Sequence, residues 1–151
     1  MRMNRYHYKE CGLDNIIIEG IDILEDADGE EVIHIPRINQ LHRIIAEAIL
    51  RRPSRLSGKE LRFLRTRMGK TQAQLAELLH RDVQTIARWE KGEVDMDGNA
   101  ETLFRLIAAE EMAIDLGADV RTVSRWSIVQ SGPREIVISM NENGSYRLKA
   151  A

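Results

Sequence analysis

The sequence has a single cysteine and no long apolar run, and both features exclude whole classes of protein. Cys11 cannot form an internal disulfide, which fits a reducing cytoplasm. No apolar run approaches the roughly 20 residues of a membrane-spanning helix, and the N-terminus has no signal-peptide core. We therefore expect a cytoplasmic protein that has no contact with a membrane.

Arrangements of residues that carry enzyme chemistry are also lacking. No Ser, His and Asp occur at a recognisable catalytic spacing, and no glycine-rich loop could cradle a phosphate. A zinc site built from Cys11, His7, His34 and His42 is conceivable, but the spacing is irregular and paired cysteines are missing. The sequence therefore predicts no enzyme activity, no metal and no cofactor.

The small net charge of −2 conceals an uneven distribution along the 151 residues. Residues 1–50 carry 5 Lys and Arg against 10 Asp and Glu, a net charge of −5. Residues 51–92 carry 11 against 4, a net charge of +7, and residues 93–151 carry 6 against 10, a net charge of −4. A local basic excess within a nearly neutral chain is typical of a DNA-binding face, although an ordinary solvated surface is the simpler alternative.

The basic stretch contains the segment TQAQLAELLHRDVQTIARWEKG at residues 71–92, which predicts two short helices joined by a tight turn. Thr71 and Gln74 have the spacing of a capping box at the start of the first helix. Asp82 is a suitable N-cap for the second helix, because its carboxylate can accept a hydrogen bond from the backbone amide of Gln84 or Thr85. Ile86 and Trp89 are assigned to packing.

This segment resembles the helix-turn-helix of the phage repressor and Cro class, also called the Xre class. The family motif runs roughly TQAELA, three residues, Gly, three residues and QTVSRWEKG. His80 stands here in place of the usual turn glycine, and His tolerates a left-handed backbone better than most residues. The resemblance implies that the second helix enters the major groove of double-stranded DNA, on a palindromic operator bound by a homodimer.

Candidate DNA contacts follow from the chemistry of the side chains. Gln84 and Arg88 are the expected base readers, because Gln pairs bidentately with adenine and Arg with guanine. Arg88 could alternatively contact a phosphate. Val83 is expected to touch a thymine methyl group. The expected phosphate contacts are Thr71, Gln72, Thr85 and Lys91.

The rest of the chain predicts an α+β protein. Residues 5–35 indicate a small N-terminal β-meander with a hairpin at Asp28 and Gly29, and residues 37–52 indicate a linker helix. A capping box at Ser57 and Glu60 opens the all-α helix-turn-helix bundle, in which the arginines at 62, 65 and 67 are expected to face outward or toward DNA.

Residues 100–116 predict an amphipathic helix ended by Gly117, followed by a helix from Asp119 to about Val129 and a C-terminal β-hairpin. The expected domains are 1–52 (β-rich with linker helix), 53–116 (helix-turn-helix) and 117–151 (C-terminal helix and hairpin). The octapeptide DVRTVSRW at 119–126 echoes DVQTIARW at 82–89. It indicates either a second helix-turn-helix copy or an ordinary helix with a similar cap.

The order of elements also resembles antitoxins of the MqsA type, part of type II toxin–antitoxin systems. Members with a working N-terminal zinc finger carry two CxxC pairs, so the resemblance implies a degenerate, zinc-free N-terminal domain here. We therefore expect a transcriptional repressor, and the resemblance implies an antitoxin that regulates its own operon. Two alternatives are an antitoxin that acts mainly by binding a toxin through residues 1–50, and a repressor that responds to a small ligand. The homodimer is expected to use the apolar stripe at 38–49 or 103–114, or the C-terminal hairpin.

Overall fold

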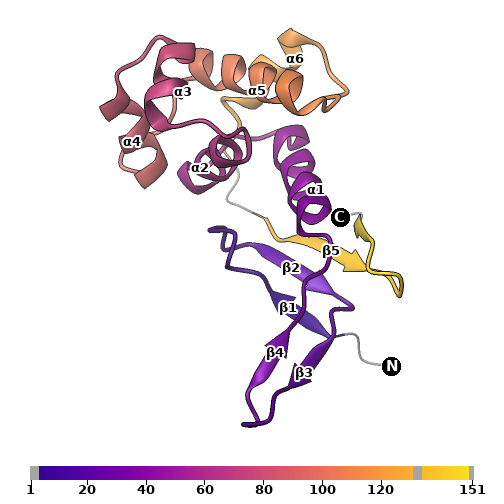
Figure 1. Ribbon diagram of the computed structural model, residues 1–151. Helices are drawn as coiled ribbons and strands as arrows, with labels where there is room; N and C mark the ends of the chain where they lie inside the picture. Colours follow the sequence, from indigo (N-terminus) through magenta and orange to yellow (C-terminus); the bar gives the residue numbers. More distant parts are fainter. Residues whose placement is uncertain (1–3, 131–133, 150–151) are drawn as a thin grey trace. The chain divides into compact units, whose positions relative to one another are not determined.

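The computed structural model describes residues 4–130 and 134–149 (Figure 1). The chain forms two compact units. The sheet unit combines residues up to 48 with those from 134 onward, and the helical unit comprises residues 49–133. The predicted α+β class is confirmed, with N-terminal strands, six described helices and a C-terminal strand pair. The predicted domain boundaries stay predictions.

The sheet unit is built around a parallel pair of strands that are far apart in the sequence. Its four-stranded sheet has the order β1 (Arg5–His7), β2 (Ile16–Glu19), β5 (Ile136–Met140) and β6 (Tyr146–Leu148). β2 and β5 run parallel, with Ile16 opposite Ile136, while the two outer pairs are antiparallel. All four residues of β2 are buried, as expected for a central strand that is covered on both faces.

A separate two-stranded ribbon pairs β3 (Ile23–Glu25) with β4 (Glu31–Ile33). Its tip is ordered by Asp26, whose Oδ1 accepts hydrogen bonds from the amides of Asp28 and Glu30, each at 2.9 Å. Gly29 takes a positive φ of 80° there, which a glycine adopts without steric cost. The hairpin predicted at Asp28 and Gly29 is therefore confirmed.

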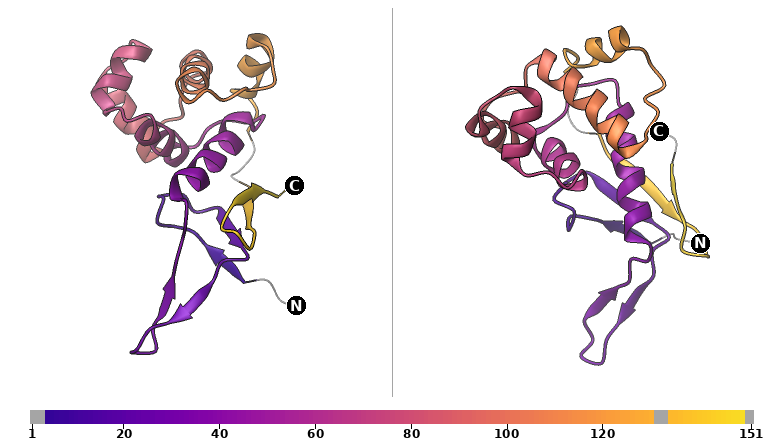
Figure 2. Two further views of the ribbon diagram at one scale, coloured as in Figure 1. Left: turned by 45° about the vertical axis from the view of Figure 1, so that its right-hand side comes forward. Right: turned by 45° about the horizontal axis from the view of Figure 1, so that its top comes forward.

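The helical unit holds the C-terminal end of α1 (Ile38–Arg51) and five further helices, while the N-terminal part of α1 lies in the sheet unit. These helices are α2 (Gly58–Arg67), α3 (Gln72–Leu79), α4 (Val83–Lys91), α5 (Gly98–Met112) and α6 (Val120–Trp126). α5 lies between α3 and the short α6, as Figure 2 shows, and it contacts both of them.

Helix α5 is shorter at its C-terminal end than predicted. It ends at Met112 rather than at residue 116, because Ala113 adopts a left-handed conformation with φ 54° and ψ 46°. The amide of Ile114 then donates to the carbonyl of Ala109 at 2.8 Å, and Ile114 is buried. Gly117 also has a positive φ, but it lies in the following loop. Burial of an apolar side chain just after the cap thus ends the helix early.

Helix α6 begins as predicted, with the carboxylate of Asp119 accepting a hydrogen bond from the amide of Thr122 at 2.8 Å. It ends at Trp126 rather than near Val129. The residues just before Asp119 are not helical, whereas α3 runs to within three residues of Asp82. The echo of the helix-turn-helix therefore covers a cap and one short helix, without a counterpart of α3 directly before it.

Arg105 on α5 fixes the linker that follows α1. Its guanidinium is fully buried and donates to the carbonyls of Leu50 and Arg52, both at 2.9 Å, and to that of Ser54. These carbonyls lie at and just beyond the end of α1, where the helix itself offers no donor. The ring of Trp126 on α6 covers the same guanidinium at 5.4 Å. One buried cation thus ties α1, α5 and α6 together.

We predict that the parallel strand pair carries much of the stability of the sheet unit. Ile138 on β5 is fully buried, and its cross-strand partner Leu148 on β6 is 43% exposed. Ile138→Ala should lower the free energy of unfolding by about 2–5 kcal/mol, because a buried cavity remains. The control Leu148→Ala should cost about 0.5 kcal/mol or less. Urea denaturation followed by circular dichroism measures both, and equal losses would contradict the prediction.

Candidate nucleic-acid interface

Helices α3 and α4 and the turn between them form the geometry that the sequence predicted. Thr71 Oγ1 accepts from the amide of Gln74 at 3.1 Å, and Gln74 Oε1 accepts from the amide of Thr71 at 2.9 Å. This is the capping box that the sequence predicted. His80 takes the left-handed conformation, with φ 56° and ψ 46°, and Gly92 ends α4 with φ 76°. The tight turn is therefore kept without the usual glycine.

Asp82 differs from the prediction in one respect. It occupies the N-cap position of α4, but its carboxylate makes no capping hydrogen bond. Only its backbone carbonyl takes part, accepting from the amides of Thr85 at 3.0 Å and Ile86 at 3.3 Å. The first turn of α4 thus keeps free amides at its exposed end, where a phosphate or a base edge can be bound.

The two faces of α4 have opposite character. Ile86, Trp89 and Glu90 are buried against the rest of the unit. Gln84, Arg88 and Lys91 are exposed and follow one another at intervals of four and three residues, so they form a single stripe. Val83, at the start of the helix, is 45% exposed, and Thr85 is half-buried beside the stripe. The structure therefore brings the predicted α4 residues together.

The two predicted residues on α3 differ from each other. Thr71 is exposed, and its hydroxyl accepts a bond from the Gln74 amide while its own hydrogen can still be donated. Gln72 is half-buried, and its Nε2 donates to Glu90 Oε1 at 3.1 Å. Gln72 therefore holds α4 in place, which leaves its amide oxygen and one remaining hydrogen for any other contact.

Glu90 is the centre of a buried ion pair. Arg65 Nε donates to Glu90 Oε2 at 2.6 Å and its Nη2 to Oε1 at 2.9 Å, while its Nη1 donates to the carbonyl of Lys70 at 2.8 Å. The Glu90 and Arg65 side chains are 4% and 13% exposed. The prediction that Arg65 faces outward or toward DNA is therefore wrong. The positive charge of Arg65 is needed in the interior, because burying the Glu90 carboxylate without a cation would cost folding free energy.

Other cations of the basic stretch are engaged as well, so the free positive charge is smaller than the sequence suggests. The exposed pair Arg81 and Asp97 joins the turn to the start of α5 at 2.8 Å. The hydrogen bond from Arg81, with a lesser contribution from the Ala100 amide, holds the pKa of Asp97 below its usual value. Within residues 4–130 and 134–149, the exposed cations without an ion pair in this stretch include Arg62, Arg88 and Lys91.

A second buried carboxylate supports the start of α2. Glu101 on α5 is fully buried, and its Oε1 accepts from the amide of Leu56 at 2.9 Å. Arg105 Nε lies 3.6 Å from Glu101 Oε2, which is an ion pair rather than a hydrogen bond. Burial raises the pKa of the Glu101 carboxyl and lowers the pKa of Arg105, since each charged form loses its hydration.

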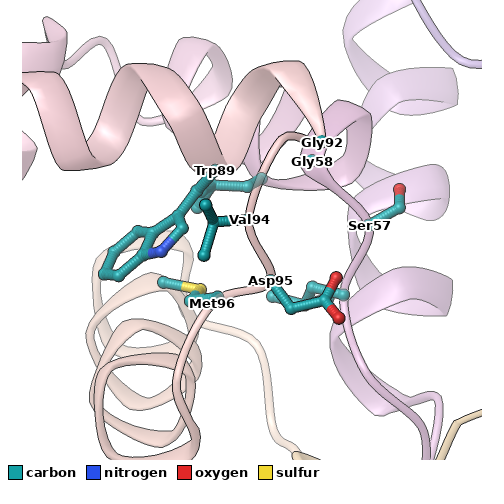
Figure 3. A pocket seen from close by; sticks show the side chains of 9 residues that line it. Ser57, Gly58, Trp89, Gly92, Val94, Asp95 and Met96 are labelled. Atoms are coloured by element: carbon teal, nitrogen blue, oxygen red, sulfur yellow. The ribbon is translucent and has the colours of Figure 1, made fainter.

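Helices α2 and α4 meet at Gly58. A Cβ atom on Gly58 would lie 2.3 Å from the carbonyl oxygen of Trp89 and 2.7 Å from that of Glu90. Figure 3 shows Gly58 beside the end of α4, at a small pocket in which Trp89, Val94 and Met96 gather. Only a residue without a side chain permits this approach, so Gly58 helps to set the position of α4.

Three of the four residues that were considered for a zinc site make separate contacts. Cys11 Sγ donates to the carbonyl of Tyr8 at 3.7 Å, and burial raises the pKa of this thiol. His42 Nε2 and Tyr8 Oη share a hydrogen bond of 2.8 Å, while His7 Nε2 contacts the carbonyl of Asp14. Across the described part of the chain, no cluster of three or more His, Cys, Asp or Glu could hold a metal ion.

Two residues that position the site, Glu90 and Gly58, were not predicted from the sequence. A signal for Glu90 was present, because it lies four residues after Ile86 and next to Trp89, on the face that packs inward. A carboxylate on such a face needs a cation from another helix. Gly58 gave no comparable signal, since a glycine at the first position of a helix is unremarkable until its neighbours are known.

We predict that Gly58→Ala destabilises the helical unit by about 1–3 kcal/mol, because the new methyl group overlaps two backbone carbonyls that cannot rotate away. Gly98→Ala is the matched control. Gly98 also begins a helix, but its Cβ would meet the side-chain hydroxyl of Ser127 at 2.8 Å, which can rotate. Thermal unfolding of both variants tests the difference, and a Gly58→Ala protein as stable as the control would refute it.

The buried pair gives a second prediction for this site. Glu90→Gln should lower the free energy of unfolding by about 3 kcal/mol, since Arg65 would be left without its counter-charge. Asp97→Asn removes one partner of the exposed pair with Arg81 and should cost about 1 kcal/mol or less. Urea denaturation ranks the two variants. Similar losses would show that the Glu90 pair is no more protected from water than the surface pair.

Comparison with known proteins agrees with this geometry. Residues 58–109, from the first residue of α2 into α5, match the family model described as a helix-turn-helix domain. No curated protein and no solved structure matches the chain. No helix in the described part of the chain is long and apolar enough to cross a membrane. The resemblance to MqsA-type antitoxins stays a prediction. The helix-turn-helix match supports a DNA-binding regulator.

Proposed function

We propose that this protein is a sequence-specific transcriptional repressor, which binds a palindromic operator as a homodimer and reads it with α4. The observation that carries the proposal is the exposed stripe of Gln84, Arg88 and Lys91 on a helix whose opposite face is anchored by Trp89 and Glu90. An α-helix is about 10–12 Å across with its side chains, so α4 fits a major groove about 12 Å wide.

The chemistry of the stripe assigns different roles to its members. Gln84 and Arg88 can each make a bidentate contact to a base, Gln with adenine and Arg with guanine. Val83 offers an apolar contact for a thymine methyl group. Lys91, at the C-terminal end of the stripe, can reach a phosphate as a point charge. Thr71 and Thr85 add hydroxyl donors along the backbone of the DNA.

Rigid support of α4 favours base readout over loose electrostatic binding. Gln72 and Arg65 hold Glu90 from α3 and α2, and Gly58 allows α2 to press against the end of α4. Side chains on a helix held from several sides lose less conformational entropy on binding. In this proposal Gln72 contributes mainly through Glu90, with its remaining amide hydrogen available to a phosphate.

A homodimer is part of the proposal because one helix-turn-helix seldom has enough contact area for specific affinity. Apolar residues are exposed on α5 and around α6, namely Leu103, Val120, Ile128 and Val129, at 38%, 57%, 75% and 45%. Along α1, by contrast, Ile38 at the start of the helix is 46% exposed, but Leu41, Ile45 and Ile49 are fully buried. The exposed set supports α5 and α6 as the dimer contact. We also propose that the repressor regulates its own operon, as an antitoxin does.

The decisive experiment compares affinity for a site selected from random DNA with affinity for unselected DNA. Gln84→Ala should cost about 1–3 kcal/mol on the selected site and much less on unselected DNA, because a base reader contributes to specificity. Lys91→Ala should weaken both by a similar factor and lower the salt slope by about one unit per protomer. Fluorescence anisotropy measures all four affinities.

The exposed Glu142 provides a control outside the helical unit, and Glu142→Ala should change neither affinity. Failure to select any common sequence would overturn the proposed function. An unchanged ratio of selected to unselected affinity in Gln84→Ala would instead show that α4 does not read bases through this residue.

A further inference from the structure

The ribbon of β3 and β4 leaves apolar surface uncovered. Leu24 and Val32 lie directly opposite each other on the two strands, and they are 60% and 45% exposed. Within the described residues, the two strands pair only with each other. A two-stranded ribbon of this kind is marginally stable by itself, so covering its apolar pair would stabilise it.

Carboxylates cluster at the end of the ribbon, next to this apolar pair. Glu25 and Glu31 form the neighbouring cross-strand pair, on the other face of the ribbon, and Asp26, Asp28 and Glu30 form the tip, all of them exposed. None of the five makes an ion pair within the described residues, and no Lys or Arg occurs between Lys9 and Arg37. Such a surface repels phosphates, and it repels a second ribbon of the same kind. Its partner must be basic.

The tip is already ordered before any partner arrives. Asp26 accepts two backbone hydrogen bonds through its side chain, and its own amide donates to the carbonyl of Glu30 at 2.8 Å. Binding therefore does not have to order the loop, which lowers its entropic cost.

A surface with the complementary character exists on this same chain. On α4, Val83 is an exposed apolar residue, and Arg88 and Lys91 are exposed cations without an ion pair in the described residues. The two cations match the carboxylates at the end of the ribbon, and Val83 offers an apolar contact on the same helix. The residues that would bind DNA phosphates and bases are also those that would bind the ribbon.

We propose that the acidic ribbon of one copy docks on α4 of a second copy and competes there with DNA. This inference rests on the proposed function, because the competition matters only if α4 binds DNA. The contact between the ribbon and α4 does not itself require DNA. Because carboxylates replace phosphates as the counter-charges, the contact weakens as salt rises, with a Debye length of about 10 Å at 0.1 M. It regulates the repressor by occupying its recognition helix when operator DNA is scarce.

Paramagnetic broadening between copies tests the contact directly. In a Cys11→Ser background, a spin label on Asp28→Cys is mixed with ¹⁵N-labelled, unmodified Cys11→Ser protein at low salt, without DNA. We expect broadening of the amides of residues 83–91, since the label is carried to α4 of the other copy. A label on Glu142→Cys, in the other exposed β-turn, should leave these amides unaffected. No broadening at 83–91, or equal broadening from both labels, would overturn the proposal.

Charge exchange separates a specific contact from general attraction. Glu25 and Glu31 are cross-strand partners, so replacing both by Lys keeps like charges opposite each other and leaves the pairing of the ribbon little changed. The labelled ribbon with Glu25→Lys and Glu31→Lys should lose the broadening, and an ¹⁵N-labelled Arg88→Glu and Lys91→Glu partner should restore it. Loss without restoration would argue against this pairing.

The same samples distinguish this inference from the proposed function. Addition of a duplex selected by the unmodified protein should abolish the broadening, because DNA and the ribbon share α4. If no duplex can be selected but the broadening is present, the docking holds and the proposed function fails. If the duplex binds while the broadening persists, the ribbon does not compete for the DNA-binding face and the proposal is wrong.

Discussion

The ion pair between Arg65 and Glu90 is the constraint on which the exposed stripe of α4 depends. It joins the end of α2 to the end of α4, and Gln72 adds α3 to the same carboxylate. A buried charge is tolerated only when its partners are well placed, so this pair specifies one arrangement of three helices. The exposed stripe of α4 is thereby presented in a fixed orientation. Gly58 adds the close backbone contact that this arrangement requires.

Ion pairs within the fold also explain why residues 51–92 present less free positive charge than their composition suggests. Several of its cations serve the fold: Arg52 pairs with Glu60, Arg65 with Glu90 and Arg81 with Asp97. The cations that are exposed without an ion pair in the described residues include two on the stripe of α4, Arg88 and Lys91. A surface with few uncommitted charges suits discrimination between DNA sequences, since non-specific affinity rises with each phosphate contact.

Contacts between distant segments decide the remainder of the architecture. Strand β5 pairs in parallel with β2 although more than a hundred residues separate them, and Arg105 binds carbonyls at the end of α1 from a helix that follows much later. The ribbon of β3 and β4 stays outside this sheet and carries its carboxylates together with an exposed apolar pair. The carboxylates of residues 25–31 are thus grouped on a ribbon that is separate from the four-stranded sheet.

The local features of this protein can be predicted from short stretches of its sequence. The capping boxes at Thr71 and Ser57, the turn at His80, the hairpin near Gly29 and the stripe on α4 all follow from neighbouring residues, because caps, turns and helical periodicity act over a few positions. Three other features became apparent only in the folded protein: the inward role of Arg65, the early end of α5 at Met112 and the pairing of β2 with β5. These depend on burial and on partners far away in the chain, which no local pattern encodes.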